Sequence, residues 1–130
     1  MKEEGRAYPR ETHVAEKLEA MVKLGLANSR MKDFYDVAEL AALFPFEGEA
    51  LAAAIRATFD RRGTPLPATT PVAFTPAFFE DAGKRAQWAG FVRRAGIQHG
   101  VTLAEVVQRV ERFAANPLAA ARGARGFRAR

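Results

Sequence analysis

The spacing of its apolar residues constrains the fold of this chain more than any other sequence feature. In residues 10–26, apolar side chains recur at Val14, Leu18, Met21 and Val22, which places them on one face of a helix. The same spacing returns in four later segments, within residues 29–44, 49–62, 76–95 and 102–116. No segment shows convincingly the alternation of apolar and polar residues that is typical of a half-buried strand. The sequence therefore predicts an all-α fold, a single compact bundle of about five helices.

Prolines, glycines and polar caps are expected to separate these helices. Four prolines in residues 63–76 exclude a regular helix there, so this stretch is predicted to be an extended connection. Asn28 or Ser29 is the expected N-cap of the second helix, and Asn116–Pro117 is expected to end the last. The fourth segment contains glycines at which it is expected to divide or close: Gly83, Gly90 and Gly96.

The composition of the chain fits one modest domain. With 130 residues and a hydrophobic fraction of 48%, the chain is long enough to bury a real core. It has no cysteine, no run of 18 apolar residues and no signal-peptide pattern, so we expect a cytoplasmic protein without a membrane segment. The formal net charge is +5, and residues 118–130 contain four arginines and no acidic residue.

This charge distribution suggests a division near the C-terminus. We predict one helical domain over residues 1–120 and a basic, disordered tail over residues 121–130. A solvated terminus explains such a tail, and electrostatic contact with RNA phosphates is the alternative.

Most familiar catalytic patterns are absent from the sequence. His13 and His99 lack metal-ligand spacing, so no metal-binding residue is predicted. There is also no Walker-type loop for nucleotide phosphates. The unusual feature is "NSRMKDFYDV", residues 28–37, where cations and carboxylates share one side of a predicted helix. One explanation is a helix start stabilised by local ion pairs. Glu19 and Lys23, four residues apart on the first helix, are spaced to form a pair of the same kind. The other is a charged site at the edge of the core.

Two elements, in this order, carry a family resemblance: "PRETHVAEKLEAMV" and "NSRMKDFYDV". Their "AEK" and "R-x-K-D-x-Y-D" patterns resemble the last two motifs of the AbiEii/AbiGii nucleotidyltransferase toxin family, which belongs to abortive-infection toxin–antitoxin systems. Downstream, "ATFDRRGTPLP" and the stretch around Trp88 are similar to the C-terminal helical region of that family. The resemblance extends from about Tyr8 to Phe113.

The resemblance implies nucleotidyl transfer, in which an NMP unit passes from an NTP to an acceptor, such as the 3′ end of a tRNA. It implies that Lys17 is the cation that holds the NTP phosphates. Asp33 would be the essential acid, which either activates the acceptor hydroxyl or orients Lys17. Arg30 and Lys32 would help to bind phosphate. The supporting residues implied are Glu16 and Asp36.

The resemblance does not extend to the catalytic core of that family. Its members carry, upstream, an α/β core with a G-S/T element and a D-x-D pair that holds Mg²⁺, and this sequence contains no D-x-D. We therefore expect Mg²⁺ and NTP only in a complete enzyme and no cofactor for this chain alone. The chain alone is expected to be inactive unless a catalytic domain joins it in cis or in trans. An antitoxin protein is a further expected partner.

A function of a different class remains open from the sequence. The chain would then be a non-catalytic helical module that binds a partner protein or a second copy of itself. An exposed apolar patch beside Tyr8, Val14 and Phe34 would support that alternative. Lys17 would in that case be an ordinary solvent-facing helix residue.

Overall fold

Helices account for nearly all the regular structure in the computed structural model, which describes the backbone of residues 9–128 and the side chains of residues 10–123. The helical elements are α1 (Pro9–Leu24), η2 (Gly25–Ala27), α2 (Met31–Leu43), α3 (Gly48–Arg62), η3 (Val72–Phe74), α4 (Pro76–Phe79), α5 (Ala82–Ala95) and α6 (Leu103–Arg128). No strand occurs in this part of the chain, so the all-α prediction is confirmed. None of these helices is both long and apolar enough to cross a bilayer.

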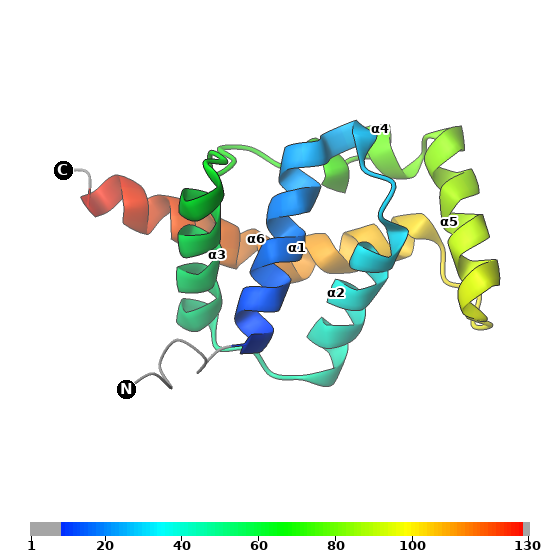
Figure 1. Cartoon of the computed structure of the whole chain (residues 1–130), viewed down its shortest axis with the longest axis horizontal. Helices are drawn as coiled ribbons and strands as arrows, with labels where there is room; N and C mark the ends of the chain where they lie inside the picture. Colours follow the sequence, from blue (N-terminus) through cyan, green and yellow to red (C-terminus); the bar gives the residue numbers. More distant parts are fainter. Residues whose placement is uncertain (1–8, 129–130) are drawn as a thin grey trace.

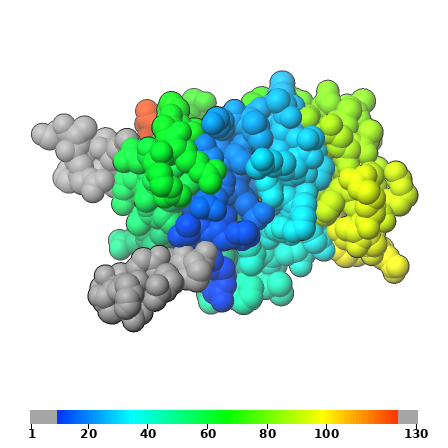
Figure 2. Space-filling model, viewed as in Figure 1, coloured from blue at the N-terminus to red at the C-terminus, as the bar shows by residue number. Residues whose placement is uncertain are grey.

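The helices form two layers around the core. On the near side of Figure 1, α3, α1 and α2 lie side by side, and α6 crosses behind them. α1 packs mainly against α3, whereas α6 packs against both α2 and α3. Figure 2 shows the same face, with α1 (blue) between α3 (green) and α2 (cyan). α5 lies on the other side of α2 and contacts it.

The apolar faces predicted from the sequence form the core. Phe34, Phe59 and Phe78 are completely buried, and the rings of Phe34 and Phe78 lie 5.2 Å apart between centroids. Val14 is also completely buried. Val14 and Phe34 therefore do not form the exposed apolar patch that would support an interaction module, and Tyr8 lies outside the described residues.

The helix ends follow ordinary capping chemistry. Gly63 and Gly96 end α3 and α5 with φ values of 69° and 72°, a left-handed conformation that favours glycine. The side chain of Asp81 accepts a hydrogen bond from the amide of Lys84 and so caps α5. The predicted fourth helix is thus two helices, α4 and α5. The proline-rich connection is extended up to η3, as predicted.

The C-terminal helix is longer than predicted. α6 continues through Pro117 into the predicted tail, so the expected helix end at Asn116–Pro117 is wrong. Pro117 lacks an amide donor, a defect that costs roughly 3 kcal/mol inside an isolated helix. Leu118 and Ala121 are buried against the rest of the molecule, which offsets that cost. α6 thus runs to Arg128, within the region for which a basic, disordered tail is predicted, and residues 129–130 lie outside the described part.

Replacing Phe34 by Ala tests whether this core holds the bundle together. We expect Phe34→Ala to lower the free energy of unfolding by about 3–5 kcal/mol, because the cavity it leaves is enclosed on every side. Phe44→Ala is the matched control: Phe44 is 37% exposed and the Arg10 guanidinium lies over its ring, so its loss should cost about 1 kcal/mol or less. Urea denaturation followed by circular dichroism gives both values. Equal losses would contradict the described core.

Candidate functional site

Lys17 and Asp33 meet where α1 and α2 pack together. The Lys17 ammonium donates a hydrogen bond to Asp33 Oδ1 at 2.7 Å and lies 3.7 Å from Asp36 Oδ2. The two side chains of the shorter pair are only 15% and 16% exposed. Lys17 is therefore held between two carboxylates at the edge of the core. The alternative in which it faces solvent as an ordinary helix residue is wrong.

The segment before α2 is anchored by Asn28. This residue is completely buried, and its Oδ1 accepts a hydrogen bond from the backbone amide of Arg30 at 2.8 Å. Its backbone carbonyl accepts a second bond, also 2.8 Å, from the ammonium of Lys84 on α5. The N-cap position itself is Arg30, whose side chain makes no capping bond, so Asn28 or Ser29 as the N-cap is wrong. Asn28 instead stabilises the turn before α2 through its side-chain bond with the amide of Arg30, two residues later.

Arg30 and Lys32 carry the solvent-exposed positive charge at the start of α2. The Lys32 ammonium bonds Asp36 Oδ2 at 2.6 Å, and this bond, with the attraction of the carboxylate, raises the pKa of Lys32 above its ordinary value. Arg30 lies 4.0 Å from Asp33 Oδ2, a loose pair. The side chains of Arg30 and Lys32 are 63% and 71% exposed, so both present positive charge to solvent. The structure thus brings the predicted residues of α2 together with Lys17.

A small charged cavity opens beside this cluster. Its volume is about 190 Å³, and its lining residues are all polar or charged: His13, Glu16, Lys17, Arg30, Asp33 and Arg62. Pockets that enclose a whole small-molecule ligand measure about 300–1,000 Å³. The cavity therefore has room for a phosphate-sized group rather than for a complete nucleotide. Its three cations, Lys17, Arg30 and Arg62, offer donors to an anion of that size, and Glu16 and Asp33 line the cavity beside them.

Glu16, predicted to support the site, lies on the rim of this cavity. Its carboxylate is 40% exposed and faces Arg61 at 3.6 Å and Arg62 at 4.0 Å. Both pairs are long and open to solvent, so they contribute little to stability.

The buried carboxylate behind the cavity is Glu19, which the sequence analysis named only as a partner for Lys23 and not as a site residue. It is 2% exposed, and it accepts hydrogen bonds from Arg62 Nη1 at 3.0 Å and Thr64 Oγ1 at 2.6 Å. These contacts join α1 to the C-terminal end of α3 and fix Arg62 beside Lys17. The predicted pair of Glu19 with Lys23 is therefore wrong. The available signal was its position, one residue after the buried Leu18 on the core side of α1.

The donor set at Lys17 does not fit a Mg²⁺ ion. Mg²⁺ requires carboxylate oxygens with free lone pairs in an octahedral arrangement. Asp33 and Asp36 instead accept hydrogen bonds from Lys17 and Lys32. Nowhere in the described part of the chain do three or more acidic or histidine side chains gather to hold a metal. The chemistry of this site is therefore that of ammonium and guanidinium groups.

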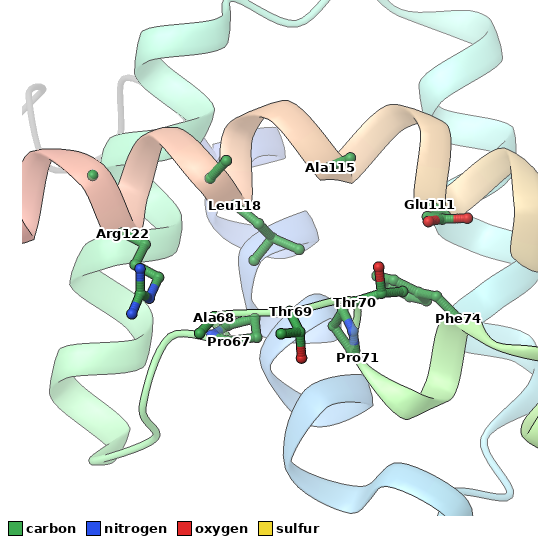
Figure 3. Close-up of a pocket in the computed structure, with 12 residues that line it drawn as sticks. Pro67, Ala68, Thr69, Thr70, Pro71, Phe74, Glu111, Ala115, Leu118 and Arg122 are labelled. Atoms are coloured by element: carbon green, nitrogen blue, oxygen red, sulfur yellow. The ribbon is translucent and has the colours of Figure 1, made fainter.

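A larger cavity elsewhere lacks such chemistry. It has a volume of about 400 Å³ and lies between the proline-rich connection and α6. Figure 3 shows Leu118 pointing from α6 toward the connection, with Glu111 and Arg122 at opposite ends. The remaining lining residues are mostly proline, alanine and threonine. These two separated charges do not form a cluster, so this cavity is not the candidate site.

The chain matches a known protein family. The family model described as "Nucleotidyl transferase AbiEii toxin, Type IV TA system" matches residues 3–114. This range contains the whole Lys17 site and ends within α6. No curated protein matched the chain, and no solved structure matched it either.

Glu19→Gln tests the internal brace of the cavity. Removing the buried charge weakens the bonds from Arg62 and Thr64, so we expect a loss of about 1–3 kcal/mol in the free energy of unfolding. Glu16→Gln makes the same chemical change three residues earlier, at an exposed pair, and should cost less than about 0.5 kcal/mol. Urea denaturation of both variants measures the difference. A Glu19→Gln protein as stable as Glu16→Gln would show that the brace is not needed.

Proposed function

Because the chain belongs to the AbiEii family of nucleotidyl transferase toxins of Type IV toxin–antitoxin systems, we propose that the cavity at Lys17 binds the phosphates of an NTP during nucleotidyl transfer. The observation that carries this proposal is the position of the Lys17 ammonium, fixed between Asp33 and Asp36 at the wall of a phosphate-sized cavity. The acceptor is RNA or another hydroxyl-bearing molecule. An antitoxin is the protein partner that membership of this family suggests.

Lys17 supplies a fixed positive charge for the phosphates. One N–H of its ammonium bonds Asp33, which leaves further N–H donors for phosphate oxygens. A compact ammonium suits the crowded oxygens of a triphosphate, and phosphoryl-type transfer depends on positioning and on stabilisation of charge. Arg30 and Arg62 line the same cavity and add guanidinium donors.

For Asp33, an orienting role is favoured over that of a general base. Its Oδ1 already accepts the bond from Lys17, and its Oδ2 faces the guanidinium of Arg30 at 4.0 Å. A carboxylate engaged on both sides by cations holds those cations in place. Asp36 assists, since it contacts both Lys17 and Lys32.

The small volume of the cavity implies that another domain completes the active site. During transfer the acceptor oxygen bonds the α-phosphorus, the bond from that phosphorus to the bridging oxygen breaks, and pyrophosphate leaves. The described residues offer a place for phosphate but no Mg²⁺ ligands and no enclosure for base and ribose. We assign those tasks to a catalytic domain present in cis or in trans, in the cytoplasm where NTPs are available. The described helices alone then do not catalyse the reaction.

Lys17→Met tests phosphate binding directly. An NMR titration of the full chain with ATP, and separately with inorganic triphosphate, should show shifts confined to α1, the start of α2 and the C-terminal end of α3. We expect Lys17→Met to weaken both affinities at least about tenfold, since an ion-assisted bond is worth roughly 1.5–3 kcal/mol. Lys23→Met removes the same charge from an exposed position of α1 and should leave both affinities unchanged. Equal weakening in both variants would refute a site at Lys17.

Asp33→Asn separates orientation from binding. With a catalytic domain of the family supplied by fusion, labelled NTP incorporation into RNA measures turnover. We expect Asp33→Asn to lower turnover at least about tenfold, because Lys17 loses its charged partner, whereas ATP affinity should stay equal or rise because a competing anion is gone. Unchanged turnover, with the thermal midpoint of unfolding preserved, would show that Asp33 is dispensable.

A further inference from the structure

The cavity between the proline-rich connection and α6 has no task in the proposed function. Its volume is about 400 Å³, and it shares no lining residue with the Lys17 cavity. Figure 3 shows its two walls, with residues 67–71 of the connection on one side and α6 on the other. Pockets that hold a whole ligand measure about 300–1,000 Å³. This cavity is therefore large enough to bind a ligand of its own.

The wall that α6 provides has opposite charges at its two ends. Its lining residues include Glu111, Ala115, Leu118 and Arg122, whose spacing of four, three and four positions is typical of one helix face. At a rise of about 1.5 Å per residue, the stretch from Glu111 to Arg122 is about 16 Å long. Ala115 and Leu118 make the surface between the two charges apolar. A ligand that meets this wall therefore needs a cation at one end, an anion at the other and an apolar group between them.

Neither charge has a partner among residues 10–123, where no hydrogen bond or ion pair involves the side chain of Glu111 or Arg122. Along α6, no residue of opposite charge stands three or four positions from either of them. Arg122 is exposed, so water accounts for its charge. Glu111 is partly buried beside the apolar surface, so its carboxylate loses hydration without gaining a cation in exchange. A cation supplied by a ligand would correct this.

The connection supplies the opposite wall in an extended conformation. Pro67 and Pro71 favour that conformation and, like Phe74, turn apolar surface toward the cavity. Among the described residues, the backbone amides between these prolines, those of residues 68–70, donate no hydrogen bond to another residue. All three residues are exposed. Free amides on an extended strand are able to bond the carbonyl oxygens of a second extended chain.

We propose that this cavity is the docking site for an extended segment of a partner protein, in which a cation and an anion flank an apolar side chain. The cation pairs with Glu111, the anion pairs with Arg122, and the apolar side chain lies beside Leu118. Five extended residues are about 13 Å long, and alternate side chains point the same way, so residues 1, 3 and 5 of such a segment reach all three positions. The inference does not depend on nucleotide binding, because the two cavities are separate.

The test uses a synthetic peptide of the sequence Lys–Thr–Phe–Thr–Glu, acetylated and amidated so that its ends carry no charge. In an NMR titration of the full chain, we expect shifts at residues 67–71 and 111–123 and a dissociation constant below about 1 mM. Ala119→Phe fills the cavity from an exposed position of α6 and should weaken binding at least about tenfold. Ala89→Phe makes the same change at an exposed position of α5 outside the cavity and should leave the affinity unchanged.

Charge variants test the two ends of the cavity. Arg122→Gln should weaken binding about two- to fivefold, as expected for an exposed ion pair, whereas Arg109→Gln removes an exposed arginine of α6 outside the cavity and should change nothing. Glu111→Lys should weaken binding of this peptide at least about fivefold, because two cations then face each other. The same variant should prefer the peptide Glu–Thr–Phe–Thr–Glu, which the parent chain binds more weakly. A merely structural role of Glu111 does not produce this exchange of preference.

Three results would overturn the inference: no peptide-induced shifts at the cavity, equal effects of Ala119→Phe and Ala89→Phe, or no exchange of preference in Glu111→Lys. Self-association of the parent chain that Ala119→Phe abolishes, measured by analytical ultracentrifugation, would also overturn it, because the occupant would then be a second copy of this chain. Thermal unfolding checks that each variant folds, and Ala115→Phe, at another exposed position of the same wall, replaces Ala119→Phe if that variant is destabilised. The ATP titration separates the two proposals: Ala119→Phe should keep its ATP affinity, and Lys17→Met should keep its peptide affinity.

Discussion

The burial of Phe34 decides where the charges of α2 point. Phe34 is completely buried, and so is Val37, three residues later on the same face. Asp33 and Asp36 each precede one of these residues, which places both carboxylates at the border between core and solvent. On α1 the buried Leu18 does the same for Lys17. The meeting of Lys17 with Asp33 therefore follows from the packing of two apolar faces, and the core provides the rigidity that a positioned ammonium needs.

The electrostatics of the site are more balanced than a list of its cations suggests. Lys17 faces two carboxylates, and Glu19 holds Arg62 from the buried side. An anion that enters the cavity must compete with these carboxylates for the same N–H donors. Binding by these helices alone is then weak, and a neighbouring domain that contributes further contacts would strengthen it. The balance also keeps a partly buried cluster of charges stable while no ligand is bound, because each buried charge has a partner.

The sequence supported part of this description and not the rest, for physical reasons. Helix faces follow from local periodicity, so the stripe at Val14 and Leu18 and the burial of Phe34 could be predicted. The Lys17–Asp33 pair came from a resemblance, since no local pattern connects two residues sixteen positions apart. The buried bonds of Glu19 depend on how α3 ends against α1, which is a tertiary contact. Likewise, the course of α6 through Pro117 depends on packing that overrides a strong local signal.

Arg30 lies at the edge of the Lys17 cavity, beside a groove between the start of α2 and α5. It lines both the Lys17 cavity and the groove, and its guanidinium is held only loosely, at 4.0 Å from Asp33. A side chain with weak attachment and several donors is able to contact phosphates on either side of it.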